Sequence, residues 1–293
     1  MKAVFAGLAT LDLVQRVPRL PGPDEKLTST TVELAAGGPA ANAAKTYAAL
    51  GGSARLLTAL GTSSVGAFVR RDLESFGVEV VDAAAGLAGQ PPVASVLVTE
   101  GSGARAVVDS PGLSLPADAG EALRAFVAAS LAGATCLLVD GHHPSLALAA
   151  ARAARAAGVP VVVDAGRPKP VWAALLPLAD TVICSADFRL GDAAPGAATA
   201  SAAAGLGTRR VAITAGADPI RWWDWAAATS GHVRTPSVHA VDTLGAGDVL
   251  HGAFCFHADG GLTFVDALAA ASGLASARCA HAGLSSWLRS LRA

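Results

Sequence analysis

Lysine is scarce in this chain of 293 residues, where it occurs only at positions 2, 26, 45 and 169. No lysine stands in a G-x-x-x-x-G-K-[ST] loop, so a P-loop nucleotide-binding enzyme is excluded. Charged residues are also few, and 22 Lys and Arg against 23 Asp and Glu leave a net charge of −1. A chain this balanced has no built-in attraction for nucleic acid or for an anionic membrane, so we expect neither as a partner.

Clustered cysteines and long apolar runs are lacking too. The four cysteines, at positions 136, 184, 255 and 279, form no C-x-x-C pair, which argues against a zinc knuckle or a disulfide framework. Isolated thiols suit a reducing compartment, and the apolar run at the N-terminus is too short for a signal peptide, so we expect a cytoplasmic protein. Hydrophobic residues make up 52% of the chain, yet no stretch reaches the roughly 18 consecutive apolar residues of a membrane span.

Short apolar runs alternate with alanine-rich segments along most of the chain. Residues 134–139 and 159–163 are typical of strands, and the segment between them, 144–157, is typical of a helix. Strands joined by a helical crossover pair in parallel. The same alternation predicts strands over 2–7, 54–60, 181–184 and 210–214, and helices over 39–50 and 65–76. An α/β fold, with a mostly parallel sheet covered by helices, is therefore expected.

Two stretches depart from this alternation. Residues 12–34 contain three prolines and then a polar β-branched run, whereas 93–99 and 104–109 flank Glu100-Gly101-Ser102-Gly103 like a β-hairpin. We expect them to form a small β-rich appendage, about 13–35 and 90–112, inserted in a single domain over 1–293. Residues 101–106 also match G-x-G-x-x-[GA], but a dinucleotide-binding turn opens a helix and a strand is expected here.

The motif with the most chemical content is Asp242-Thr243-Leu244-Gly245-Ala246-Gly247-Asp248, which precedes an apolar segment typical of a helix over 249–258. Glycines at the start of a helix let the backbone approach a ligand, and the N–H groups of the first turn attract an anion such as phosphate. Asp248 in this turn has two possible roles. It is either a helix cap or a general base that takes a proton from a hydroxyl attacking a phosphoryl group.

A second glycine motif, Gly37-Gly38-Pro39-Ala40-Ala41-Asn42, also opens a predicted helix. An ordinary loop-to-helix junction has this pattern, but so does a polyol site in which Gly38 admits the ligand and Asn42 offers a donor and an acceptor. Asp12 follows the first expected strand, and Asp140 ends another. Both positions agree with the rule that open α/β sheets bind ligands beyond the carboxyl ends of their strands.

Taken together, the two glycine motifs resemble the two signatures of the ribokinase-like (PfkB) carbohydrate kinases. Gly7-x-x-x-x-Asp12, Leu60-Gly61-x-x-x-x-Gly66 and the Gly283 loop follow in that family's order, so the resemblance covers essentially the whole chain. It implies a three-layer α/β/α core and a β-sheet lid that closes over a sugar. It also implies ATP as phosphoryl donor, Mg²⁺ on its phosphates, and K⁺ as a further ion to consider. Exposed lid strands favour a homodimer in which two lids pair.

The resemblance also assigns roles to individual residues. It makes Asp248 the catalytic base, and it forms an anion hole from the N–H groups of Gly245, Ala246 and Gly247. It places four residues on the sugar hydroxyls: Asp12, Gly38, Asn42 and Asp140. It places four others on the nucleotide: Thr214, Gly216, Thr243 and Gly283. Two departures stand out, because Pro219 occupies the third position of the nucleotide motif T-x-G-x-x-G, and Ser185-Ala186-Asp187-Phe188 replaces N-x-x-E beside the metal. Mg²⁺ would then be held mainly by phosphates and water, with Asp187 as a candidate for its outer shell.

Details of the two motifs bear on the acceptor. Sulfofructose kinases have motifs similar to Gly37–Ala41 and to Gly247-Asp248-Val249-x-His251. Ketohexokinases have a motif similar to Val241–Gly245. Ribokinases have a lysine at the position of Pro39. We therefore expect a ketose-type sugar, phosphorylated on a primary hydroxyl. A phosphorylated or sulfonated sugar would need a cationic grip, for which the candidates are Arg16, Arg105 and Arg167. The alternatives are a nucleoside kinase of the same fold and a sugar- or nucleotide-binding regulator without catalysis.

Overall fold

A computed structural model gives the fold, and it describes residues 1–101, 104–116 and 120–292. A large sheet forms its centre, with the strand order β13-β12-β11-β10-β9-β8-β1-β4-β5. The strands are β1 (Lys2–Ala6), β4 (Ser53–Thr58), β5 (Val78–Asp82), β8 (Cys136–Val139), β9 (Val161–Ala165), β10 (Thr181–Ser185), β11 (Arg210–Ala215), β12 (Asp218–Asp224) and β13 (Thr229–Val233). Neighbours from β5 to β11 are parallel, and β12 and β13 extend the sheet as an antiparallel hairpin.

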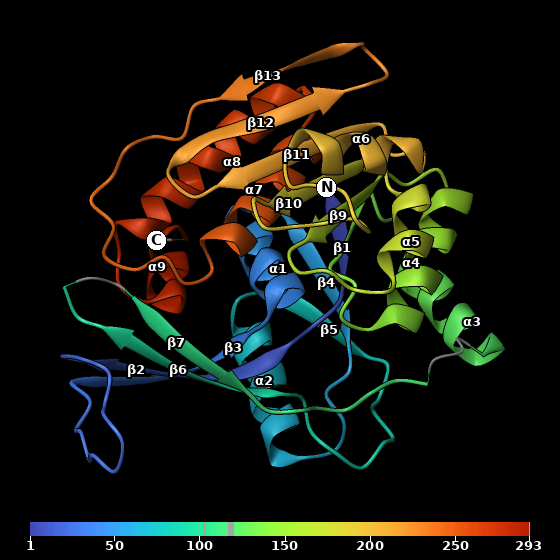
Figure 1. The fold of residues 1–293 in the computed structure, drawn as a ribbon. Coiled ribbons are helices and arrows are strands. Elements are labelled where there is room, and N and C mark those ends of the chain that lie inside the picture. Colours follow the sequence, from blue (N-terminus) through green and yellow to red (C-terminus); the bar gives the residue numbers. More distant parts are fainter. Residues whose placement is uncertain (102–103, 117–119, 293) are drawn as a thin grey trace.

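Helices cover both faces of this sheet (Figure 1). They are α1 (Pro39–Ala49), α2 (Ser64–Ser75), α3 (Glu121–Ser130), α4 (Pro144–Ala156), α5 (Trp172–Leu175), α6 (Ala197–Gly205), α7 (Ala246–Asp259), α8 (Phe264–Cys279) and α9 (Leu284–Ser290), with a 3₁₀ turn, η1 (Leu176–Leu178), after α5. Buried residues of α1, α7 and α8 pack in one hydrophobic cluster, and those of α4, α5 and α6 pack in another. The predicted three-layer α/β/α core is confirmed.

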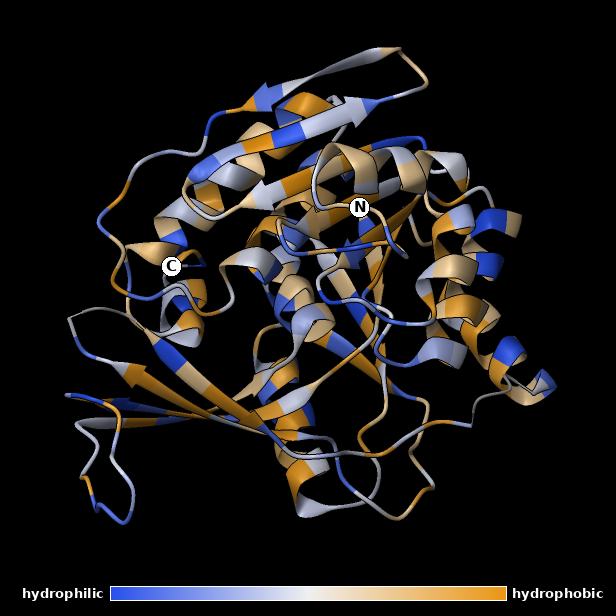
Figure 2. Ribbon diagram, in the orientation of Figure 1, coloured by the Kyte–Doolittle hydropathy of each residue, from blue (hydrophilic) through white to orange (hydrophobic). Residues whose placement is uncertain are grey.

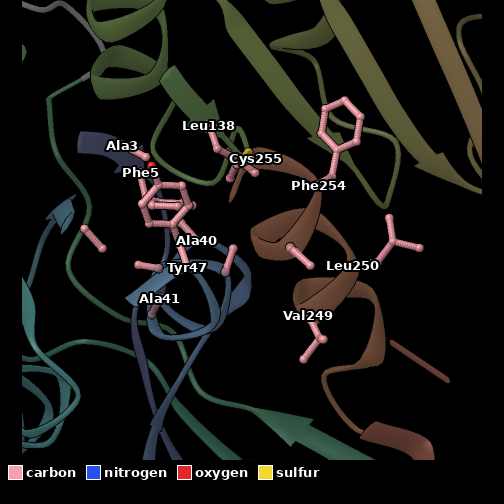
Figure 3. Packing of buried hydrophobic residues seen from close by; sticks show 14 of the residues in the cluster. Ala3, Phe5, Ala40, Ala41, Tyr47, Leu138, Val249, Leu250, Phe254 and Cys255 are labelled. Carbon is pink, nitrogen blue, oxygen red and sulfur yellow. The ribbon is translucent and has the colours of Figure 1, made fainter. Parts of the chain in front are cut away.

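Alternation along the strands divides the core between the two faces. Phe5 of β1 contributes to the cluster of α1 and α7, whereas its neighbour Val4 contributes to the cluster of α4. Figure 3 shows the first cluster, in which the rings of Phe5 and Tyr47 meet edge to face at 5.6 Å. Each large apolar side chain buried in this way contributes roughly 1.5–3 kcal/mol to stability. In Figure 2 the hydrophobic residues accordingly lie along the central strands.

A very close contact fixes α1 against α7, the two helices that carry the glycine motifs. Pro39 begins α1, where its missing N–H costs nothing, and the helix ends just before Gly51, which has a φ of 96°. The helix is almost entirely buried and rich in alanine. A Cβ on Gly252 of α7 would lie 2.3 Å from the Ala43 carbonyl oxygen, so the two backbones nearly touch. This contact holds both motifs in a fixed relation.

A second sheet of four strands, with the order β3-β2-β6-β7, projects from one end of the core (Figure 1). Its strands are β2 (Thr10–Val17), β3 (Thr31–Gly37), β6 (Val93–Thr99) and β7 (Arg105–Asp109). β6 and β7 pair antiparallel, as expected for the hairpin, whose turn residues 102 and 103 lie outside the described part of the chain. The sheet begins at Thr10 rather than near residue 13. Asp12 is therefore part of a strand of this sheet and does not follow a core strand directly.

Among the described residues, no helix combines the length and apolar character needed to cross a membrane.

Candidate active site

The second glycine-rich motif forms the turn that opens α7. Gly245 has a φ of 75°, a left-handed conformation that suits glycine, and the helix begins at the next residue without a side-chain cap. Before it, Asp242 Oδ1 accepts a hydrogen bond from the Leu244 N–H at 2.9 Å. The first regular helical bond runs from the Val249 N–H to the Gly245 carbonyl at 2.9 Å, and the Ala246 N–H donates to the Thr243 carbonyl over a longer 3.3 Å. The backbone N–H groups of the first turn of α7 therefore lie at the positive, N-terminal end of the helix dipole.

Two cavities meet at this turn. A cavity of about 510 Å³ lies between α7, α8 and the β12 hairpin, and another of about 490 Å³ lies between α7, α1 and the small sheet. The residues that line both are Arg105, Thr214, Thr243, Ala246 and Gly247. A group held at the start of α7 would therefore be within reach of ligands in both cavities.

Asp248 lies in the wall of the second cavity, one residue beyond this junction. Its Oδ2 accepts a hydrogen bond from Asn42 Nδ2 at 2.8 Å. Burial, together with the negative charge of Asp164, raises the pKa of Asp248 to about 7, although the Asn42 hydrogen bond and His251 act in the opposite direction. A carboxyl group with a pKa near neutrality can accept a proton and release it again at physiological pH.

Asp12, Gly38 and Asn42, which the sequence predicts to hold sugar hydroxyls, all line the second cavity. Asp12 comes from β2 and accepts a hydrogen bond from the Thr10 hydroxyl at 2.5 Å. Burial raises the pKa of Asp12, opposed by that hydrogen bond and by the charge of Lys45. Gly38 has a φ of 96°, and a Cβ there would lie 2.5 Å from the Leu8 carbonyl oxygen, so only glycine fits. Asn42 Oδ1 is buried and has no hydrogen-bond partner among the described residues, which leaves an acceptor for a ligand.

Asp140 reaches the same cavity, but its carboxylate is already occupied by the backbone. It accepts hydrogen bonds from the N–H groups of Leu8 at 2.9 Å, Ala40 at 3.2 Å and His142 at 3.0 Å. Burial alone would raise the pKa of Asp140, but the charge of His142, its hydrogen bonds and the charge of Lys169 hold that pKa well below its usual range. Asp140 thus fastens β1, α1 and the β8 loop together. This engagement was not foreseen from the sequence.

Three of the four residues predicted for the nucleotide line the first cavity: Thr214, Gly216 and Thr243. The Thr243 hydroxyl accepts a hydrogen bond from Arg105 of β7 at 2.8 Å. Gly283 is not among the lining residues of that cavity, and its N–H donates to Asp242 Oδ2 at 3.1 Å. Asp187 lines a separate hollow beside Lys169 and Trp172, so the structure does not bring it to either cavity. Within the described ranges, no group of three His, Cys, Asp or Glu side chains could hold a metal ion.

The sequence reading missed two buried residues, Asp164 and His251. His251 lies one helical turn after the anion-binding turn, with Nδ1 2.7 Å from the Gly247 carbonyl, and with Nε2 3.2 Å from the Ile183 carbonyl and 3.5 Å from Asp164. The spacing of three residues from Asp248 places His251 on the same side of α7. Asp164 is the next-to-last residue of β9, and Asp140 directly follows β8. The spacing of His251 from Asp248 and the place of Asp164 near the end of a predicted strand were both visible in the sequence.

The chain belongs to the pfkB family of carbohydrate kinases, ATP-dependent sugar kinases whose family model matches residues 1–290. The family resemblance and the ribokinase-like fold expected from the two glycine motifs are thereby confirmed. Ribokinase from Mus musculus is 29% identical over 271 residues, which are 87% of this chain and 80% of that protein.

Two further proteins show how far the similarity extends. The ATP-dependent ribose-1-phosphate kinase of Halopiger xanaduensis is 32% identical over 167 residues, and this match spans only 57% of the present chain and 55% of that relative. The structure of phosphofructokinase-2 from Escherichia coli in complex with potassium matches with a TM-score of 0.77 at 20% identity, over 99% of both chains. At that level of identity the structural likeness shows the fold alone.

Proposed function

We propose that the protein transfers the γ-phosphoryl group of ATP to a primary hydroxyl of a sugar, with Asp248 as general base. The observation that carries this proposal is the position of Asp248, buried and hydrogen-bonded to Asn42, where the nucleotide-sized cavity meets the cavity lined by Asp12 and Gly38. A general base located between a phosphate-binding helix N-terminus and a polyol-binding cavity suits in-line phosphoryl transfer.

The proposed mechanism uses the residues of this site in order. Asp12 and the free Asn42 Oδ1 bind sugar hydroxyls and orient one of them toward Asp248. Asp248 accepts the proton of that hydroxyl as its oxygen attacks phosphorus. The N–H groups of Gly245 and Gly247 at the start of α7 stabilise the negative charge on the transferring group. The Ala246 N–H, which donates to the Thr243 carbonyl over 3.3 Å, contributes as part of the same positive end of the helix. The small sheet excludes water from the transferring group.

Mg²⁺ belongs to this proposal as an ion held mainly by the phosphates of ATP and by water. Among the described residues, no side-chain cluster could bind it directly, and Asp187 lies in a different hollow. When bound, the ion neutralises part of the negative charge on the phosphates. Asp164 lines the same cavity as Asp12 and Asp248, and its Oδ1 lies 3.5 Å from His251 Nε2, so its carboxylate is our candidate for the outer shell of the ion.

The sugar is proposed to be a ketose or a related pentose, and the relatives extend the range to be tested to ribose and ribose 1-phosphate. Arg105 and Arg167 both line the sugar cavity, where either could bind a phosphate already present on the acceptor. A nucleoside acceptor is less well supported, because no phenylalanine, tyrosine or tryptophan is among the described residues that line this cavity.

A coupled assay of ADP release tests this proposal. Mg·ATP is offered with fructose, ribose, ribose 1-phosphate, sulfofructose and adenosine, and the product is identified by mass spectrometry. We expect ADP release to depend on one of the sugars or sugar phosphates. ADP binding without turnover on any acceptor would instead favour a regulator that has lost catalysis.

The pKa of Asp248 predicts the pH dependence of the reaction. The basic form is the unprotonated carboxylate, and burial raises its pKa from 3.8 to about 7. Activity should therefore fall as the pH drops through 7, well above the range in which an exposed aspartate would lose its charge. The measurement is kcat/KM between pH 5 and 9 at saturating Mg·ATP. A profile that stays flat down to pH 5 would contradict the assignment.

We also propose a homodimer that forms through the small sheet. Asp12, Val96 and Arg105 face the sugar cavity, whereas Val32, Leu34 and Val108 of the same sheet are 59%, 53% and 70% exposed. Hydrophobic segments are visible along these strands in Figure 2. A second copy of the chain would cover them and would shield the edge strands.

Light scattering after gel filtration tests the dimer. We expect the mass of two chains for the wild type, and the mass of one chain for Leu34→Glu, because a carboxylate in the interface would be desolvated without a partner. Leu206→Glu is the matched control and should stay dimeric, because Leu206 is exposed but follows α6 of the core and is not part of the small sheet. A wild-type monomer at micromolar concentration would overturn this part of the proposal.

A further inference from the structure

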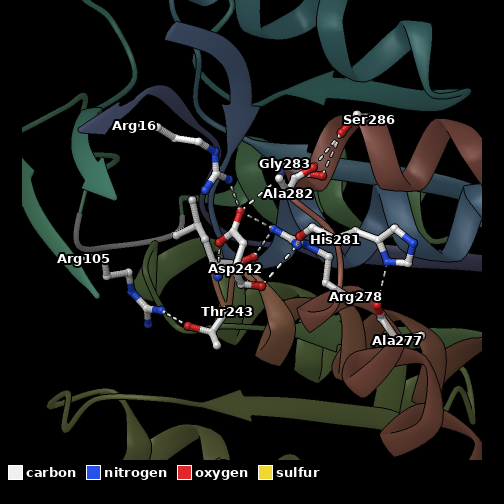
Figure 4. Close-up of polar contacts among 11 residues, drawn as sticks. Arg16, Arg105, Asp242, Thr243, Ala277, Arg278, His281, Ala282, Gly283 and Ser286 are labelled. Carbon is white, nitrogen blue, oxygen red and sulfur yellow. Dashed lines mark hydrogen bonds and ion pairs between the residues drawn. The ribbon is translucent and has the colours of Figure 1, made fainter. Parts of the chain in front are cut away.

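A wholly buried guanidinium lies beneath the turn that opens α7. Arg278, in the last turn of α8, has 0% of its surface exposed. Its Nη2 donates to Asp242 Oδ2 and to the Leu244 carbonyl, both at 3.0 Å, and its Nη1 donates to the His281 carbonyl at 2.6 Å and the Asp242 carbonyl at 3.3 Å. Figure 4 shows that the acceptors of these bonds come from two segments, the loop before α7 that contains Asp242 and the turn after α8 that contains His281.

The oxygens around Arg278 are of the kind that bind a hard cation. Three are backbone carbonyls and one is a carboxylate, and they come from two separate segments that must be held together for the loop to keep its shape. K⁺ is a cation that such oxygens could bind, and the family resemblance makes K⁺ an ion to consider for this chain. In this chain the guanidinium already takes up all four oxygens, so the residues do not fit a bound K⁺.

The surrounding charges also disfavour an added cation. Asp242 Oδ2 accepts a second guanidinium, that of Arg16 from β2, at 2.6 Å, as well as the Gly283 N–H at 3.1 Å. One carboxylate thus faces two arginines. The small adjoining cavity, of about 20 Å³, is lined by the carboxylates of Asp12, Glu33 and Asp242 and by the buried Lys45. It has room for about one water molecule, and one of its three carboxylates, Asp242, is already paired with two guanidinium groups. A cation there would also lie beside the Lys45 side chain.

We propose that the Arg278 guanidinium is a built-in cation that holds the anion-binding turn in place and makes phosphoryl transfer independent of K⁺. This inference rests on the proposed kinase function for its activity readout. Arg278 acts through the positions of Asp242 and Leu244, and hence through the N–H groups that follow them, so it is a positioning residue. Arg16 joins the same carboxylate from the lid sheet, which ties lid position to this turn.

The first test uses the unmodified protein. ADP release and the melting temperature are measured in KCl and in N-methylglucamine chloride at equal ionic strength. We expect no activation by K⁺ and no K⁺-dependent rise in melting temperature. A saturable increase in ADP release or in melting temperature with K⁺, absent with N-methylglucamine, would overturn the proposal. If no sugar is phosphorylated, the melting temperature and the affinity for Mg·ADP still report on K⁺ binding, which separates failure of this inference from failure of the proposed function.

The second test removes the built-in cation. Arg278→Ala is expected to lower kcat by about 10²-fold, the usual effect of losing oriented donors at a developing charge, with a smaller change in KM. Millimolar guanidinium or K⁺ should restore part of kcat, whereas N-methylglucamine should not. A folded variant that neither ion rescues would show a merely structural role and overturn the proposal. Arg278→Lys covers the case in which the alanine variant does not fold, and it should keep more activity. Arg209→Ala, at an exposed position, is the control.

Discussion

Replacing Asp248 with asparagine should lower kcat by roughly 10²–10⁴-fold, the usual contribution of a general base. The amide keeps the size of the side chain and can still contact Asn42, but it cannot accept the proton of the attacking hydroxyl. Asp248 lines the cavity proposed for the sugar and not the cavity proposed for the nucleotide, so the affinity for Mg·ADP should change little. The measurement is a single-turnover rate with the best acceptor, together with ADP binding by calorimetry.

The Asp248→Asn variant should also be at least as stable as the wild type. A carboxyl group whose pKa rises on folding favours the folded state below pH 4, and this benefit is lost as the pH rises through 7. Above pH 7 the buried charge costs stability, so removing it should raise the melting temperature. Asp266→Asn is the matched control, because Asp266 is also in the first turn of a helix but is exposed. Unchanged turnover in a folded Asp248→Asn protein would remove Asp248 from the role of base.

Most of this site could be read from the sequence because its backbone depends on residues with distinctive local chemistry. Gly38 and Gly245 adopt positive φ values of 96° and 75°, which few other residues tolerate, and each lies next to a helix whose apolar pattern is evident. The central sheet could be predicted because its strands and helices alternate in distinct apolar patterns along the sequence. The bounds of the expected segments differ from the observed ones by only a few residues at most ends.

The sequence does not show which polar groups the backbone itself engages. Asp140 and Asp12 occupy similar sequence contexts, yet Asp140 accepts backbone N–H groups from two distant segments as well as that of His142, while Asp12 comes from the lid sheet. Arg278 is a further case, because nothing local distinguishes a buried arginine in an alanine-rich helix from an exposed one. These assignments depend on contacts between residues as far apart as 132 positions, which spacing rules cannot reach.

Replacing Gly247 with valine should stop turnover without unfolding the protein. A Cβ on Gly247 meets no protein atom within 4 Å, so the side chain would enter open space. That space is the junction of the two cavities, both of which Gly247 lines. The valine methyl groups would occupy the volume that the transferring phosphoryl group needs and would cover the first-turn donors. We expect kcat to fall by about 10²–10³-fold, as when a donor to a developing charge is lost.

Gly273→Val in α8 is the matched control for this substitution. Gly273 is also a helical glycine with no atom within 4 Å of its Cβ, but it lines neither cavity. Both variants should melt within a few degrees of the wild type, because replacing a helical glycine in open space changes stability by only about 1 kcal/mol. Only Gly247→Val should lose activity. If both variants turn over normally, the phosphoryl group does not pass the start of α7, and the path between the two cavities must lie elsewhere.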